Sequence, residues 1–136
     1  MSFDGYPPHF RAAEFVCGCE GEGCDGLSPN PDRTRHLAWA LEVVRQVMRK
    51  PIAINSGIRC GPHNRAVGGS LGSQHLHGAA ADLRPIGATV DDLHATLLML
   101  IEEGEIPDGG LGAYDSFVHY DIGAAGRRWD ERTPDA

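Results

Sequence analysis

The sequence predicts an α+β fold in which two main helices pack against a small, mainly antiparallel sheet. Two stretches carry apolar residues at helical spacing, and four short segments have the composition of strands. Turn-forming residues, 18 Gly and 9 Pro, separate these segments. The 136 residues fit one domain, 1–136, in which residues 1–30 are expected to be an irregular, cysteine-containing segment.

The first helix is expected to begin close to Pro31, which suits a first helical turn. Asn30 or Asp32 can cap it. Its buried face is an apolar stripe formed by Leu37, Leu41, Val44 and Met48. The pair Lys50-Pro51 ends this helix, because the residue before a proline disfavours helical backbone.

Four segments are expected to be strands, namely residues 51–59, 79–85, 109–114 and 117–123. The last two are joined by a tight turn at Asp115-Ser116. A second helix begins at Thr89, where Asp92 completes a variant of the capping box, and it ends at Gly104. Its apolar face is formed by Leu93, Leu97, Leu100 and Ile101.

The charge and composition argue against several classes of partner. The net charge is −7, and no cluster of Lys and Arg is present, so we expect no nucleic-acid partner. No apolar run approaches the roughly 20 residues of a membrane span. Residues 1–17 lack the plan of a signal peptide, so we expect synthesis in the cytoplasm and delivery to the cell wall or periplasm by other means. We expect a monomer.

Three residues can form a metal site. On one helix, His75 and Asp82 would lie about 10 Å apart along the axis, which is too far for a shared ion. A turn near Gly78 followed by a strand can bring them together. His119, on the last predicted strand, supplies a third ligand. Two His and one carboxylate leave a fourth position open, as in catalytic zinc sites.

Other ligand choices stay open at this point. His77 competes with His75, because residues two apart share a face of a strand, and Asp121 competes similarly beside His119. The remaining candidates are interpreted as ordinary loop or surface histidines, namely His36, His63 and His94.

Several motifs resemble those of the zinc D-alanyl-D-alanine carboxypeptidase family. They are "SGIR" at 56–59, "NRAVGG" at 64–69, "SQHLHGAAAD" at 73–82 and "HYD" at 119–121. That family includes L-alanyl-D-glutamate endopeptidases and phage endolysins, and it shares its zinc site with the Hedgehog signalling domain. The resemblance covers about half the chain. It implies a Hedgehog/DD-peptidase-like fold.

The resemblance also implies roles for individual residues. His75, Asp82 and His119 would bind one catalytic Zn²⁺, Arg59 would contact a carbonyl or carboxylate of the substrate, and Ser73 would line the site. The planar, permanently charged fork of Arg suits such a contact. The alternatives are a surface salt bridge for Arg59 and a turn-forming hydroxyl for Ser73.

The sequence departs from the family pattern at two positions. Ile58 replaces the usual aromatic residue, which would alter a subsite or simply repack. Several family members carry a catalytic Glu three residues before the last zinc His, where this chain has Ser116. Because a hydroxyl is no general base, we expect the adjacent Asp115 to act as the catalytic base. The alternative is a turn-forming Asp.

The cysteines allow three interpretations. The chain contains Cys17, Cys19, Cys24 and Cys60. They could form disulfides that attach the N-terminal segment to the core, bind a second zinc ion, or remain free thiols. The sequence cannot choose among the possible disulfide connectivities.

The leading hypothesis is a zinc metallopeptidase that hydrolyses the stem peptides of peptidoglycan, as a D-Ala-D-Ala carboxypeptidase or an L-Ala-D-Glu endopeptidase. The resemblance favours an endolysin-like enzyme that degrades the cell wall. Two alternatives remain: a catalytically inactive, zinc-containing binding module, and a phage structural domain.

Overall fold

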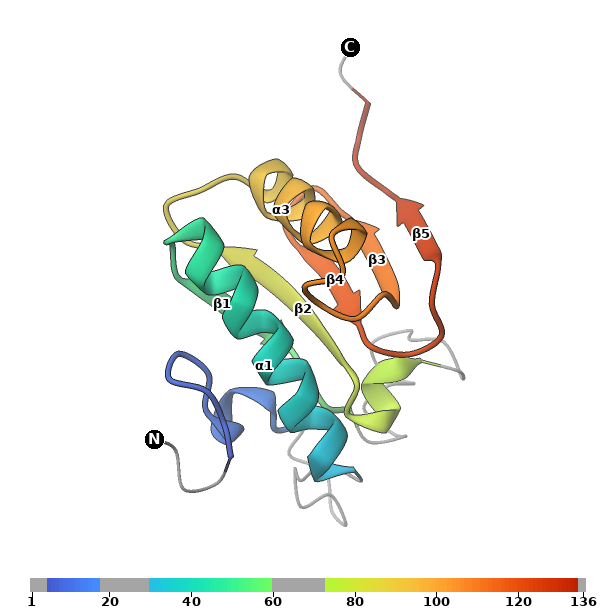
Figure 1. Ribbon diagram of the computed structural model, residues 1–136. Helices are drawn as coiled ribbons and strands as arrows, with labels where there is room; N and C mark the ends of the chain where they lie inside the picture. Colours follow the sequence, from blue (N-terminus) through green and yellow to red (C-terminus); the bar gives the residue numbers. More distant parts are fainter. Residues whose placement is uncertain (1–4, 18–29, 60–72, 135–136) are drawn as a thin grey trace.

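The computed structural model describes residues 5–17, 30–59 and 73–134. In chain order its elements are the 3₁₀ helix η1 (Ala12–Phe15), α1 (Pro31–Met48), β1 (Ile52–Ser56), the 3₁₀ helix η2 (Gln74–His77), β2 (Ala80–Pro85), α3 (Val90–Glu102), β3 (Gly110–Ala113), β4 (Val118–Asp121) and β5 (Arg127–Asp130) (Figure 1). Both expected helices and all four expected strands are present, which confirms the α+β prediction. The strand β5 was not expected.

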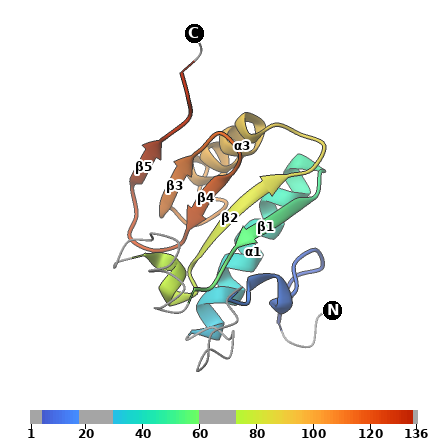
Figure 2. The same cartoon turned by 180° about the vertical axis from the view of Figure 1, so that it is seen from behind.

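Both α-helices of the described residues cover the same face of the sheet. Its strand order is β1-β2-β4-β3-β5, and every pairing is antiparallel except that of β3 with β5. Figure 1 shows α1 and α3 in front of the sheet, and Figure 2 shows the opposite face. Side chains alternate along each strand, so Leu83, Val118 and Tyr120 enter the core beneath the helices. Asp82 and His119 therefore point to the opposite face.

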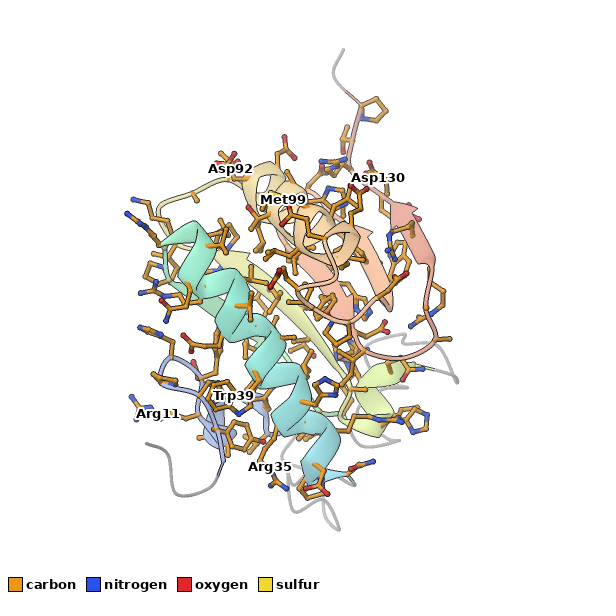
Figure 3. The ribbon with its side chains drawn as sticks, in the orientation of Figure 1. Arg11, Arg35, Trp39, Asp92, Met99 and Asp130 are labelled. Carbon is orange, nitrogen blue, oxygen red and sulfur yellow. The ribbon has the colours of Figure 1, made fainter. Side chains whose placement is uncertain are left out.

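The caps of both helices agree with the sequence. Asn30 caps α1 by accepting a hydrogen bond from the backbone N–H of Arg33 at 3.2 Å. Thr89 and Asp92 form the expected capping box of α3. Trp39 on α1 and Met99 on α3 are exposed (Figure 3). Within the described residues, no helix is long and apolar enough to cross a membrane.

The described part of the N-terminal segment packs onto α1. Its aromatic residues Tyr6, Phe10 and Phe15 are buried in the core. The backbone N–H and Nδ1 of His9 contact the two carboxylate oxygens of Glu42 at 2.9 and 2.7 Å. Cys17 is buried, while the three other cysteines lie outside the described residues, so the state of all four stays a prediction.

Candidate metal centre

One row of paired residues crosses all five strands of the sheet. Ser56 pairs with Asp82, Asp82 with His119, His119 with Gly112, and Gly112 with Trp129. Directly paired residues on neighbouring strands point to the same side of a sheet. We call these five residues the cross-strand row. A register shift in β1, just before Ser56, places that residue opposite Asp82.

A short turn carries His75 to the edge of this row. The side chain of Ser73 caps η2 by accepting a hydrogen bond from the backbone N–H of His75 at 3.2 Å. Gly78 ends η2 in the left-handed conformation, with φ 68°. The buried hydroxyl of Thr34 on α1 donates to the Gly78 carbonyl at 2.7 Å. These contacts hold a buried His75 beside the start of β2.

The His75 ring is oriented by a backbone carbonyl. Nδ1 of His75 lies 2.6 Å from the carbonyl oxygen of Gly57. Because a carbonyl only accepts hydrogen bonds, Nδ1 must carry a proton, which makes Nε2 the acceptor of the neutral ring. At Gly57 the chain passes so close to η1 that a Cβ would lie 2.9 Å from Cα of Phe15. Glycine is therefore required where this carbonyl reaches the site.

The His119 ring is oriented by a buried carboxylate. Its Nε2 lies 2.6 Å from Oδ2 of Asp121. Burial raises the pKa of Asp121, but its hydrogen bonds outweigh burial and lower the pKa to about 2. The ionised carboxylate must accept, so Nε2 donates and Nδ1 faces Asp82. Asp121 is itself held by the backbone N–H groups of Gly110 and Gly123 and by the guanidinium of Arg127.

Three ligand atoms converge at the centre of this arrangement. His75, Asp82 and His119 each offer one ligand atom, and these three atoms all lie within 4.8 Å of one another. Oδ1 of Asp82 is 3.3 Å from Nε2 of His75 and 3.1 Å from Nδ1 of His119. The structure thus brings together the three residues proposed as ligands. His77 is exposed and lies outside this group.

The contacts between Asp82 and His119 shift the pKa values of both side chains. Burial raises the pKa of Asp82, but its contacts with His119 and His75 outweigh burial and hold the pKa well below its ordinary value. Burial lowers the pKa of His119, but hydrogen bonds to Asp121 and Asp82 outweigh burial and raise it. When His119 is protonated on both nitrogens, Nδ1 can donate to Asp82.

The residues fit a zinc ion. Among the buried side-chain polar atoms of the described residues, His75 Nε2 has no hydrogen-bond partner, since its approach to Asp82 lacks hydrogen-bond geometry. A buried acceptor nitrogen costs free energy unless a donor or a metal satisfies it. Two imidazole nitrogens and one carboxylate oxygen are a common donor set for zinc.

Arg59 contacts this group from the side of β1. Its guanidinium donates to Oδ2 of Asp82 at 3.2 Å and to the hydroxyl of Ser56 at 3.2 Å. The Arg59–Asp82 ion pair is largely buried, so it is not the surface salt bridge considered from the sequence. Ile58, which replaces an aromatic residue of the family pattern, is buried in the hydrophobic core.

Asp115 and Ser73 have local partners. The carboxylate of Asp115, in the exposed β3–β4 turn, accepts from the backbone N–H of Thr133 at 2.8 Å and from its hydroxyl at 2.6 Å. These hydrogen bonds lower the pKa of Asp115. Asp115 is not among the three convergent residues. Both the Asp115 contacts and the capping by Ser73 fit the turn-forming alternatives, so the proposed roles of these residues stay predictions.

Sequence reasoning missed two residues of the cross-strand row, Gly112 and Trp129, and also the tether made by Thr34. A glycine before a strand residue such as Ala113 carries no recognisable signal, and the stretch 124–134 lacks apolar alternation. The relevance of Gly112 and Trp129 follows only from the strand register, and that of Thr34 only from its contact with the Gly78 carbonyl.

Comparison with known proteins agrees with this geometry. The family model described as Peptidase M15 matches residues 8–121, a range that includes His75, Asp82 and His119. The zinc D-Ala-D-Ala carboxypeptidase of Streptomyces albus G is 35% identical over 132 aligned residues, covering 93% of this chain and 50% of that protein. The chain therefore spans about half the length of this relative.

We predict that the purified protein binds one zinc ion through His75, Asp82 and His119. His75→Ala should lose this ion because Nε2 is removed, whereas the matched control His77→Ala should keep it. The test is to measure the metal content of each dialysed variant by mass spectrometry. Zinc retained by a His119→Ala variant is subtracted, because it is bound elsewhere. Loss of zinc in His77→Ala together with retention in His75→Ala would show that the ligand choice is wrong.

Proposed function

Because the chain belongs to the peptidase M15 family, we propose that it is a zinc-dependent peptidase that hydrolyses the stem peptides of peptidoglycan. The observation that carries the proposal is the convergence of His75 Nε2, His119 Nδ1 and Asp82 beside an Arg. The name of the Streptomyces albus G relative supports both the zinc ion and this substrate class.

The residues of the site have separate tasks in this proposal. Zinc bound here would polarise the scissile carbonyl and acidify a water molecule. The Gly57 carbonyl and the Asp121 carboxylate keep His75 and His119 in the tautomers that ligation needs. Arg59, whose positive charge lies beside Asp82, would bind a carbonyl or carboxylate of the peptide. Ser73 would shape the site through the turn that it caps.

The proposed catalytic base is Asp115. A carboxylate in this role takes a proton from water and returns it to the leaving amine. In the described conformation Thr133 holds both oxygens, and the lowered pKa makes Asp115 a weak base. To act as the base, Asp115 must therefore release its two hydrogen bonds from Thr133 and accept one from water when substrate binds.

The substrate could be cleaved at either of two bonds. Carboxypeptidase action would remove the terminal D-alanine, and endopeptidase action would cut between L-alanine and D-glutamate. We propose that a monomer acts at the cell wall or periplasm, as an endolysin-like member would, and that residues 1–136 work as one domain.

A catalytically inactive zinc-binding module is the second candidate. Two observations favour it: Ser116 stands where several family members have a catalytic Glu, and the neighbouring Asp115 is bound to Thr133. Such a module would bind zinc and wall peptides without cutting them.

Digestion of purified peptidoglycan, followed by mass spectrometry of the soluble products, tests the proposed function. We predict release of D-alanine or of fragments with a new amino-terminal D-glutamate, because these are the two bonds compatible with the site. His119→Ala should release neither. A zinc-loaded wild-type protein that binds walls but releases no fragment would establish the inactive module instead.

Replacing Arg59 by Lys should lower turnover at least about tenfold. Lys keeps the charge but loses the planar fork, and one good charged contact contributes about 1.4 kcal/mol. Initial rates on wall peptides should be compared with zinc content and thermal unfolding of the same variant. A large loss of thermal stability with normal turnover of the folded fraction would assign Arg59 to structure alone.

Replacing Asp115 by Asn should keep zinc and the fold while lowering turnover by about a hundredfold or more, because shape is kept and basicity is lost. Thr133→Val, which removes a hydrogen bond to Asp115 but leaves the carboxylate, is the matched control and should retain activity. Near-normal hydrolysis by Asp115→Asn would leave Asp115 as a turn residue.

A further inference from the structure

Beside His119, the indole of Trp129 occupies the space that a side chain at Gly112 would fill. Gly112 lies between His119 and Trp129 in the cross-strand row. A Cβ built at Gly112 would overlap the Trp129 indole. The indole thus lies over the bare backbone of β3 and reaches His119, with ring centroids 5.0 Å apart and planes at 43°.

The indole is held in this position by a hydrogen bond. Nε1 of Trp129 donates to the hydroxyl of Tyr114 at 2.8 Å. The Tyr114 ring is in turn stacked on Phe117, with centroids 4.3 Å apart and planes at 10°. The pairing of β5 with β3 fixes the backbone of Trp129. Trp129 is therefore a restrained group and not a loosely attached surface side chain.

The His119 ring needs such a neighbour. Its hydrogen bond to Asp121 restrains the position of Nε2, whereas the direction of the Nδ1 lone pair also depends on the plane of the ring. Among the described residues, two aromatic rings lie against the ring of His119: His75, at a centroid distance of 5.2 Å, and Trp129. His75 is itself a proposed ligand, so Trp129 is the ring contact from outside the ligand group.

We infer that Trp129 is a positioning residue for His119, and that residue 112 is glycine because the indole must cross it. The inference rests on the proposed zinc function. Trp129 would act through the ring of His119 by setting its plane. Partners of this kind typically change metal affinity by about tenfold to a hundredfold when they are removed.

The test measures zinc affinity by competition with a chelator, together with the absorption spectrum of the Co²⁺ form, which reports ligand geometry. Trp129→Ala and Gly112→Ala should each weaken zinc binding by about tenfold or more and alter the Co²⁺ spectrum. Trp129→Phe, which keeps a ring, should restore most of the affinity. Trp39→Ala is the matched control, because Trp39 is half exposed on α1, and it should leave affinity unchanged (Figure 3).

A double-mutant cycle separates positioning from general stability. Once the indole is gone, an alanine at 112 no longer meets the atoms that a Cβ would overlap most closely, so the Gly112→Ala/Trp129→Ala variant should bind zinc no more weakly than Trp129→Ala. Additive losses would overturn the inference. The stability of the metal-free protein is measured by urea unfolding with chelator present. If Trp129 were purely structural, removing it would lower this stability without changing zinc affinity.

The outcomes distinguish this inference from the proposed function. If the wild type fails to bind zinc, the proposed function itself fails. If the wild type binds zinc and Trp129→Ala keeps both affinity and Co²⁺ spectrum, only the inference fails, even if KM rises through a lost substrate contact. If Trp129→Ala does not fold, unchanged zinc affinity and an unchanged Co²⁺ spectrum in folded Gly112→Ala have the same meaning.

Discussion

The pairing of Asp82 with His119 across β2 and β4 is the constraint on which the candidate site depends. Side chains alternate along a strand, so a slip of one residue would send His119 into the core. Leu83 and Val118, paired in the same ladder, are completely buried beneath the helices and oppose such a slip. Apolar packing on one face of the sheet thereby positions the charged groups on the other.

The third ligand reaches the site by a different route. His75 belongs to a turn and not to the sheet, so strand register cannot place it. It is held by a hydroxyl from α1, through Thr34 and Gly78, and by the Gly57 carbonyl. The candidate metal centre therefore lies where helix, turn and sheet meet. In each histidine, an acceptor hydrogen-bonded to one ring nitrogen leaves the other nitrogen as the proposed ligand.

Much of this arrangement could be predicted from the sequence. Helix caps such as Asn30 and Thr89 depend on neighbours a few residues away, and the spacing of His75 and Asp82 already required a turn followed by a strand. Long-range features could not be predicted. The edge strand β5 lacks apolar alternation, and the partner of Asp115 is Thr133, on the distant C-terminal segment. The crossing of Gly112 by Trp129 depends on pairing that no local pattern encodes.

We propose that two buried acceptors, the Gly57 carbonyl and the Asp121 carboxylate, preset the histidine tautomers for one metal ion. Long-range ¹H–¹⁵N NMR spectra of the histidine rings, recorded with and without zinc, test this most directly. The account predicts zinc at Nε2 of His75 and at Nδ1 of His119, with the opposite ring nitrogens protonated. Ligation of His119 through Nε2, or a His75 ring that does not respond to zinc, would contradict it.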